Sequence, residues 1–550
     1  MNRKEFLSLL HPARPKSNEE PVKILSGLDP YTGTWDVMQA AHLLRRTGFG
    51  AKKSDIDMLT QMSMEQAVDF ILTVPGAQPA PPVNNYNGTL ADANVPAGQT
   101  WVNDPVTNYN PLINNLRVDS LRSWWIGQMI NNGPNIREKM TLFLHNHFAT
   151  EANVVNVAQA LYIHYAMLRS NCVGNFKNLA KLVTLDVSML RYLNGELNSA
   201  LAPDENYSRE LQELFTVGKG PDALWTEDDV KEAAKVLTGY RINILTLTYY
   251  FDSTKHHTGN KQFSSFYNNT VIQGQLGASG QNELDDLLDM LFDTEECAKH
   301  ICRNLYRFFV YYKIDATVEA NVITPLAEIF RNSGYELLPT LEALFKSQHF
   351  FDTLQLGCVI KNPLDYLVGM TREFNVTIPN ASQLASQYAH WNLLYSNAAL
   401  LNMNIGDPPV VSGWPAYYQQ PMFHEIWIDS DTIAKRVSMA DAVLSSGLTG
   451  GGANILIDPI PFTAALPSPA NPNDLVNDAV KYLYGIEIGS NTFDYLKSFL
   501  LSGQSDDSYW IDAWIAYTQD PGDPTNLNIV QTRLKAFYKA MLQQPEYHLS

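Results

Sequence analysis

Cysteine is scarce in this chain, with four residues among 550. They are Cys172, Cys297, Cys302 and Cys358. No pair has the C-x-x-C spacing of a zinc ribbon or knuckle, and four scattered thiols do not make a disulfide framework. The sequence therefore predicts reduced, buried cysteines rather than a redox or metal role.

Basic charge is also low. The chain has 39 Lys and Arg residues against 57 Asp and Glu residues, which gives a formal net charge of -18. A field of this sign repels phosphate backbones and anionic lipid surfaces, and the sequence has no basic patch. We expect no nucleic-acid partner, while a protein partner and a small-molecule substrate both stay open.

Long hydrophobic runs are missing. No window approaches the roughly 20 apolar residues that a spanning helix needs, so we expect no membrane span. The first eight residues resemble the start of a twin-arginine export signal, with Lys4 in place of the second arginine. Only Leu9 and Leu10 extend it, whereas such signals need an apolar core of about 7–15 residues. We expect no functional cleavable signal, which leaves a cytoplasmic location or export through a degenerate twin-arginine-like N-terminus.

Familiar catalytic motifs are absent from the sequence. It has no G-x-S-x-G elbow, no phosphate-binding G-x-x-x-x-G-K loop, no G-x-G-x-x-G after a strand and no H-E-x-x-H. The usual hydrolase, kinase and dehydrogenase templates therefore do not apply.

What the chain does have is helical periodicity, with apolar residues at three- and four-residue spacing. This predicts helices over 36–47, 55–73, 111–131, 135–147, 154–170, 174–191, 205–217, 227–238, 296–313, 318–333 and 338–348, and near 430–446, 474–484, 491–501 and 528–543. Residues 75–110 and 447–473, rich in Pro, Gly, Asn and Ala, predict surface connections. A β-branched and aromatic run at 244–251 predicts a small β-hairpin with residues 261–267.

The predicted fold class is mainly α, a large multi-helix globular assembly with long irregular insertions and one small hairpin. We divide it into an N-terminal extension (1–34), a helical domain with the candidate polar site (35–280), a second helical block (281–400) and a C-terminal Trp-, Pro- and Gly-rich helical region (401–550) packed on the first domain. Prolines and charges in residues 1–30 indicate an exposed, poorly packed start.

The helix predicted around residues 204–218 separates its chemistry between two faces. Its polar face gathers Asn206, Arg209, Glu210 and Glu213. Two neighbouring carboxylates raise one another's pKa or attract a cation, which suits general acid/base or metal chemistry. A surface ladder of Glu205, Arg209 and Glu213, contributing about 0.3–0.5 kcal/mol per pair, is the alternative, but it leaves Glu210 without a cation. We expect this face, Arg209 included, to lie in a polar interior.

Histidines supply the other candidate ligands. His145 and His147 are about 200° apart around a helix, so they cannot share one ion unless the helix has ended. His147 continues an apolar stripe and should face inward, with a backbone carbonyl as its commonest partner, while His145 should face elsewhere. His256 and His257 lie in a polar turn and could aim at one ion.

Aromatic residues follow later in the chain. Gly413, Trp414 and Pro415, with Tyr417, Tyr418 and Trp427, could form a pocket wall, although interdomain packing is the commoner role of such residues.

Seven segments in this order resemble the large bacterial family catalogued as domain of unknown function number 1800. They are 41–50 (AHLLRRTGFG), 137–148 (REKMTLFLHNHF), 206–218, 229–239, 256–261 (HHTGNK), 361–363 (KNP) and 413–415 (GWP). The resemblance covers about residues 36 to 545. The chain departs from the family's His-Asp-x-Gly-x-Lys pattern with His257 in the aspartate position, and it has Asp204 where asparagine is common.

The resemblance implies a mostly α-helical bacterial protein, often exported, with no established activity. It also implies that the segments of His147, Glu210 and His256 matter together, and the His257 departure puts a carboxylate role at that position in doubt.

Two functional hypotheses follow. The first is a metal-dependent or acid/base enzyme with catalytic groups Glu210, Glu213, Arg209, Asn206 and His145, and with a divalent metal ion held by His147, Glu210 and His256. The second is a non-catalytic cell-envelope or assembly protein in which the same groups form a buried polar network. Both require the helices at 135–147 and 205–218 to pack against each other.

Overall fold

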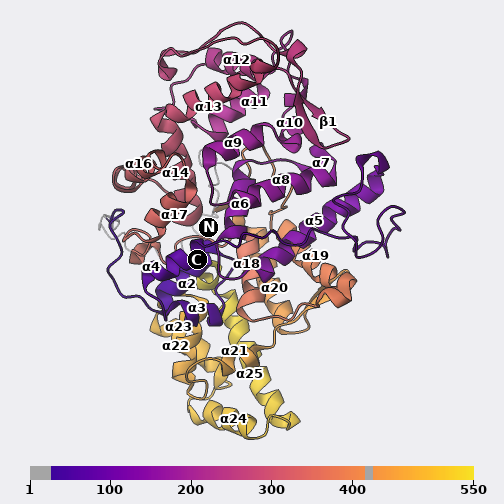
Figure 1. Cartoon of the computed structure of the whole chain (residues 1–550). Helices are drawn as coiled ribbons and strands as arrows, with labels where there is room; N and C mark the ends of the chain where they lie inside the picture. Colours follow the sequence, from indigo (N-terminus) through magenta and orange to yellow (C-terminus); the bar gives the residue numbers. More distant parts are fainter. Residues whose placement is uncertain (1–25, 415–424) are drawn as a thin grey trace, which may run out of the picture.

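The computed structural model describes residues 26–414 and 425–550 (Figure 1). The fold is mainly α, as predicted. The twin-arginine-like start, together with Pro415, Tyr417 and Tyr418, lies outside the described residues. No helix in the described part of the chain is long and apolar enough to cross a membrane.

The first half of the chain supplies most of the candidate residues. Its helices are α2 (Val37–Thr47), α3 (Lys53–Leu59), α4 (Met64–Leu72), α5 (Pro111–Asn131), α6 (Arg137–His147), α7 (Ala152–Val155), α8 (Ala158–Ser170), α9 (Phe176–Thr184), α10 (Val187–Tyr192), α11 (Glu205–Glu210), the π-helix η3 (Leu211–Phe215) and α12 (Glu227–Val236).

Three segments predicted as single helices are each broken in two. The 55–73 segment restarts at Ser63, whose side chain forms a capping box with Gln66. Asn156 interrupts 154–170 with a φ of 51°, a left-handed conformation that ends α7. Asp186 interrupts 174–191 by capping α10.

The second half continues with helices. They are α13 (Glu283–Asp293), α14 (Glu295–Phe309), α15 (Ala316–Val318), the π-helix η7 (Glu319–Ile323), α16 (Thr324–Asn332), α17 (Leu337–Phe345), α18 (Pro363–Glu373), α19 (Leu384–Leu400), α20 (Ser430–Leu444), α21 (Pro459–Ala464), α22 (Pro472–Leu483), α23 (Ser490–Leu500), α24 (Ser508–Gln519) and α25 (Pro524–Gln543). Helices α13, α18, α19 and α24 match none of the predicted helix ranges, although the first three lie in the predicted second helical block, and α21 lies inside the predicted connection at 447–473.

Short 3-10 turns join these helices. They are η1 (Val106–Asn108), η2 (Gly195–Leu197), η4 (Ser253–Lys255), η5 (Ser265–Tyr267), η6 (Gly277–Asn282), η8 (Thr353–Gln355), η9 (Ala381–Gln383), η10 (Glu425–Trp427) and η11 (Pro545–His548).

The described strands form three antiparallel pairs. They are β1 (Tyr240–Asn243) with β2 (Thr248–Phe251), β3 (Lys261–Gln262) with β4 (Val271–Ile272), and β5 (Leu448–Gly450) with β6 (Ala453–Ile455). The predicted pairing of 244–251 with 261–267 is wrong, because residues 244–247 make the turn between β1 and β2. Leu247 has a φ of 51° there, which reverses the chain before the second run can be reached.

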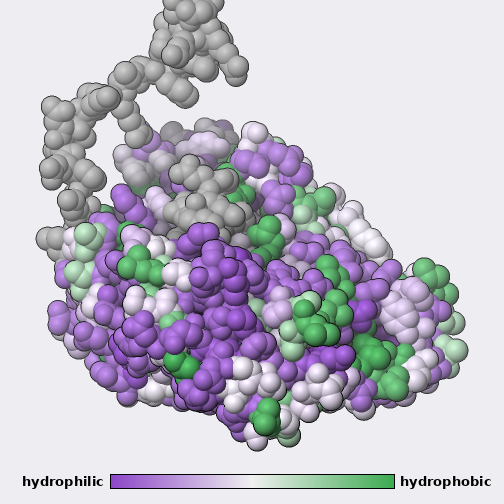
Figure 2. Space-filling model, turned by 90° about the horizontal axis from the view of Figure 1, so that it is seen from above, coloured by the Kyte–Doolittle hydropathy of each residue, from purple (hydrophilic) through white to green (hydrophobic). Residues whose placement is uncertain are grey.

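The helices enclose a continuous hydrophobic core. In Figure 1 α11, α12, α13 and β1 lie at the upper end, α5, α6 and α8 cross the middle, and α21–α25 lie at the lower end. Seen from the upper end, the surface is mostly hydrophilic with separate hydrophobic groups (Figure 2).

Two predicted packing relationships can be compared with the structure. Residues 1–25 lie outside the described residues, but the following segment is packed, since Pro30 bridges to Ser347 and the Tyr31 amide donates to the Lys346 carbonyl at 2.9 Å. The predicted contact between the helices at 135–147 and 205–218 is confirmed, because His147 of α6 lies against Phe215 of η3. The four-part domain division stays a prediction.

Candidate functional site

The helix that carries Glu210 changes its winding in the middle. Helix α11 is capped by Asp204, whose carboxylate accepts the Asn206 backbone amide at 2.8 Å, and it passes at Leu211 into the π-helix η3. A π-turn has wider winding than an α-helix, so the side chains after Glu210 are rotated from their α-helical positions. The face assignment made at 3.6 residues per turn therefore holds only as far as Glu210.

Glu210 and Glu213 stand together, but only one has a cation. The Glu213 carboxylate pairs with Lys219 at 2.9 Å. Glu210 is half-buried and makes no hydrogen bond or ion pair with any other residue in the described part of the chain. Burial and then the charge of Glu213 raise the pKa of Glu210 to about 7, against the opposing influence of Arg209 and Lys219. This carboxyl is therefore poised to gain or lose a proton near neutral pH.

Two residues that sequence reasoning missed lie near this carboxyl. Tyr192, the last residue of α10, donates its hydroxyl to Glu151 Oε1 at 2.9 Å. Burial, the Glu151 hydrogen bond and the negative charges of Glu151, Glu210 and Asp407 raise the pKa of Tyr192, so its phenol stays protonated. These residues belong to no recognisable motif, because only the packing of α10 on α7 brings them together.

Arg209 lies at the surface, and the prediction that it belongs to a polar interior is wrong. Its side chain is 33% exposed and binds Glu227 of α12 through two hydrogen bonds of 2.8 and 2.6 Å. It also contacts Glu205 at 3.3 Å. Asn206 is exposed as well, with its amide 3.4 Å from the Leu193 carbonyl. Glu227 attracts Arg209 because α12 packs beside α11, which the helical wheel could not show.

His147 has the carbonyl partner that its apolar surroundings predicted. Its Nε2 lies 3.1 Å from the Phe215 carbonyl oxygen, so this nitrogen carries the proton. Burial lowers the pKa of His147 to about 4, with the Phe215 hydrogen bond opposing it. His147 is thus a neutral packing residue joining α6 to η3.

His145 is buried too, so the expectation that only His147 faces inward is wrong. The Gly406 amide donates to His145 Nε2 at 3.2 Å, and the ring packs against Trp125, Tyr165 and Trp414. Burial, His164 and Arg122 together lower its pKa to about 3. The reason is that α6 is covered on nearly all sides, so both histidines reach the core in different directions.

His256 belongs to a fully buried ionic network. Its Nδ1 lies 2.9 Å from the Thr238 carbonyl, and its Nε2 lies 3.0 Å from Glu283 Oε1. Lys261 pairs with the other oxygen of Glu283, and the side chains of Lys261 and Glu283 are both 0% exposed. The His256 and Lys261 positions of the polar turn thus meet at one carboxylate, which sequence reasoning did not identify.

The three residues proposed as metal ligands have separate surroundings. His147 lies among aromatic rings, Glu210 is half-buried beside Glu213, and His256 faces Glu283. Among residues 26–414 and 425–550, no three His, Cys, Asp or Glu side chains are grouped so that they could hold a metal ion.

A second histidine–carboxylate pair also escaped prediction. His164 Nδ1 lies 2.9 Å from Asp186 Oδ1, and Asp186 also caps α10. His164 is 0% exposed, so it has no route to a solvent-borne substrate in this conformation. The only sequence signal for the pair is the capping aspartate before α10.

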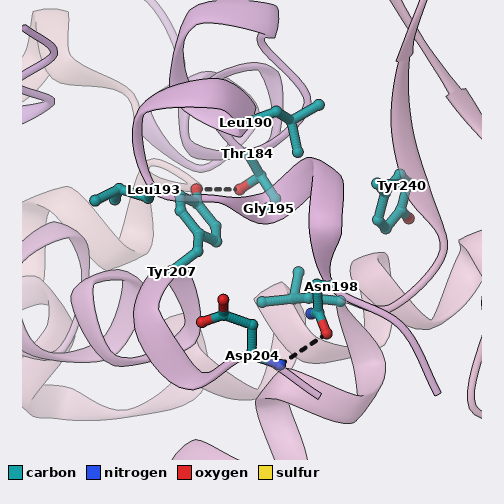
Figure 3. A pocket seen from close by; sticks show the side chains of 9 residues that line it. Thr184, Leu190, Leu193, Gly195, Asn198, Asp204, Tyr207 and Tyr240 are labelled. Carbon is teal, nitrogen blue, oxygen red and sulfur yellow. Dashed lines mark hydrogen bonds between the residues drawn. The ribbon is translucent and has the colours of Figure 1, made fainter. Parts of the chain in front are cut away.

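A small hollow lies at the N-terminal end of α11 (Figure 3). Its lining includes Leu190, Tyr207 and Tyr240, with the Tyr207 hydroxyl 2.8 Å from Thr184 Oγ1. Asn198 holds the Asp204 amide at 3.0 Å on the opposite side. Helix α11 thus borders a concave surface one turn before it presents Glu210.

Comparison with known proteins gives one match. A family model described as a protein of unknown function, DUF1800, matches residues 42–549. No curated protein and no solved structure matches the chain.

Proposed function

The chain belongs to the DUF1800 family, whose description assigns no reaction, and we propose that it is an acid/base enzyme in which Glu210 transfers the proton. The observation that carries this proposal is a half-buried carboxyl with no cation of its own and a pKa of about 7. General acid/base catalysis is most efficient when the pKa of the group lies near the working pH.

The neighbours of Glu210 have supporting roles in this proposal. Glu213 raises the pKa of Glu210, and Lys219 holds Glu213 in place. The phenol of Tyr192 stays protonated and donates to Glu151, and the charge of Glu210 contributes to its raised pKa. Because His147, Glu210 and His256 have separate surroundings, the proposal assigns Glu210 to proton transfer rather than to a divalent metal ion.

The test is a panel of chromogenic esters, amides and glycosides, assayed with wild-type protein and two variants between about pH 5 and about pH 9. We expect turnover whose rate changes around pH 7, and a loss of about 100-fold or more in Glu210→Gln. Glu227→Gln is the matched control, since it removes a neighbouring carboxylate that faces solvent. Equal turnover in Glu210→Gln and wild type would show that Glu210 takes no part in the reaction.

A second candidate function is favoured by the His256, Lys261 and Glu283 network. These groups are buried and satisfy one another, as expected of a non-catalytic envelope or assembly protein whose polar cluster fixes packing. The absence of turnover across the panel, combined with a large loss of stability in Glu283→Gln, would favour this candidate over the enzyme.

A further inference from the structure

A groove away from Glu210 is rich in uncharged polar side chains. It lies between the segment 75–79, which follows α4, and the junction of α5 with α6. Its space amounts to about 240 Å³. Five carboxamide side chains line it, those of Gln78, Gln128, Asn131, Asn132 and Asn135. Most small-ligand pockets are largely apolar, so a groove with this lining suits a polar ligand.

The walls of this groove are held in place by contacts within the protein. Gln78 Nε2 donates to Ser170 Oγ of α8 at 3.1 Å. On the α5 side, Arg372 Nη1 donates to the Asn132 carbonyl at 2.6 Å, and Asn132 Nδ2 donates to the Asn135 carbonyl at 2.9 Å. The groove is therefore formed before a ligand binds, which lowers the ordering cost of binding.

Several of the carboxamide groups have unused hydrogen-bonding capacity. Asn131 is exposed, and its side chain makes no hydrogen bond with any residue in the described part of the chain. The Gln128 amide nitrogen has only a 3.5 Å contact with the Trp124 carbonyl. A carboxamide offers donors and an acceptor, and a hydroxyl group likewise offers both. The groove therefore matches a ligand with several hydroxyl groups.

Arg137, the first residue of α6, adds a cation without an acidic partner to the lining. The residue is 7% exposed, and its Nη1 donates to the Ala77 carbonyl at 2.9 Å. Its Nε is buried with no hydrogen-bond partner, and its Nη2 has none among the described residues. The Nε–Nη2 edge of the guanidinium fork is thus the part left for a carboxylate. An anion there would offset the desolvation of this cation.

Glu138 is the only acid among the described lining residues, and its charge is already balanced. Arg169 donates to its two oxygens at 2.9 and 2.8 Å, and Trp125 Nε1 donates to one of them at 3.0 Å. The Glu138 side chain is 4% exposed. The guanidinium of Arg137 therefore keeps its positive charge uncompensated, in a chain whose net charge is -18.

We propose that this groove binds a sugar acid, a small carboxylate with several hydroxyl groups. Arg137 would bind the carboxylate, and the carboxamides would bind the hydroxyl groups. A guanidinium–carboxylate pair is stronger and more directional than a neutral hydrogen bond. Arg137 also lies at the positive end of the α6 dipole, which favours an anion. No aromatic side chain is among the described lining residues, so hydrogen bonds rather than ring stacking would recognise the ligand.

The groove is separate from the proposed proton transfer. Arg137 and His147 stand at opposite ends of α6, ten residues or about 15 Å apart, and it is His147 that contacts η3. No described lining residue is among the groups that shift the pKa of Glu210. Binding in the groove and turnover at Glu210 can therefore succeed or fail independently.

Isothermal titration of the full chain with D-glucuronate at pH 7 and constant ionic strength tests the proposal. We expect saturable binding to wild type. Glucose lacks the carboxylate and acetate lacks the hydroxyl groups, so each should bind at least about tenfold more weakly. Arg137→Gln should weaken glucuronate binding at least about tenfold, and Arg137→Lys should be intermediate because it keeps the charge and loses the fork.

Two further variants separate the groove from general effects. Asn131→Ala should weaken glucuronate binding about threefold, because it removes one neutral hydrogen-bonding group from an exposed position. Arg331→Gln is the matched control and should bind glucuronate as wild type does. Arg331 also donates to a backbone carbonyl, that of Asp293 at 3.1 Å, but it lies on α16 and does not line the groove.

Several outcomes would overturn the proposal. Wild-type protein without saturable glucuronate binding is one of them, and it needs no variant to fold. Glucose as strong a ligand as glucuronate would leave the Arg137 charge without a role, and acetate as strong a ligand would show a simple anion site. Unchanged affinity in Arg137→Gln is another contradiction. A glucuronate-dependent rise in the melting temperature of a variant shows that it is folded and still binds.

Discussion

Glu283→Gln should destabilise the protein strongly, because Glu283 is the only carboxylate among the described residues that contacts both the buried Lys261 and His256. Its two oxygens receive Lys261 on one side, and His256 at 3.0 Å with the Gln275 amide at 2.7 Å on the other. Both charged side chains of the Lys261–Glu283 pair are fully buried. Removing the negative charge leaves a buried ammonium uncompensated, which costs about 3–5 kcal/mol.

Denaturant titration of the free energy of unfolding measures this change. Glu227→Gln is the control, and we expect it to lose less than about 1 kcal/mol because Glu227 pairs with Arg209 at the surface. A loss below about 1 kcal/mol in Glu283→Gln as well would refute the reasoning that the network excludes water and that Lys261 needs the charge of Glu283 to be stable there.

The difference in the free energy of unfolding between wild type and Glu283→Gln should depend on pH. Burial alone would raise the pKa of Glu283, but hydrogen bonds from His256 and Lys261 outweigh it and leave the pKa below its ordinary value. A carboxyl with a lowered folded-state pKa stabilises the fold above its unfolded pKa and loses that contribution as pH falls through the folded value. The gap between wild type and Glu283→Gln should therefore be full above about pH 4.3 and close in more acidic solution.

Three further outcomes are expected. Arg209→Ala should lower the free energy of unfolding by less than about 1 kcal/mol in a denaturant titration, since the pairs of Arg209 with Glu205 and Glu227 are solvent-screened. A loss of about 3 kcal/mol would show that Arg209 lies in a polar interior. Acidification from about pH 6.5 to pH 4 should lower the free energy of unfolding by up to about 3 kcal/mol through His147, because its pKa of about 4 means that the unfolded chain binds the proton first. His147→Gln should reduce the slope by this contribution, while His145 and the other buried histidines keep theirs. A thiol reagent should label at most Cys358 in native protein, because the other three cysteines are buried, and rapid labelling of all four would contradict this packing.

Local signals predicted some elements closely. The periodicity of the 111–131 segment predicts α5 with the bounds that it has in the structure, where Asn110 caps the helix and Pro111 occupies its first turn. The breaks at Ser63 and Asn156 were missed because apolar spacing continues across them, while the capping box and the left-handed residue act locally. Periodicity thus predicts the existence of helices more accurately than the positions of their ends.

The sequence predicted only part of the candidate site. Glu210 stood out because no cation lies at helical spacing from it, and the structure agrees that it has no ion-pair partner among the described residues. The π-turn after Glu210 depends on packing. So do the contacts of Glu227 with Arg209, of Glu151 with Tyr192 and of Glu283 with His256, because each joins two segments that no common sequence pattern links. A helical wheel contains no information about these contacts.

The central claim, that Glu210 exchanges a proton near neutral pH, is tested most directly by nuclear magnetic resonance. Protein with glutamate labelled at the carboxyl carbon is titrated, and the Glu210 resonance is identified by its loss in Glu210→Gln. We expect an inflection near pH 7, moved to lower pH in Glu213→Gln because the neighbouring charge is gone. An inflection near about 4.3, the ordinary value for glutamate, would contradict the account.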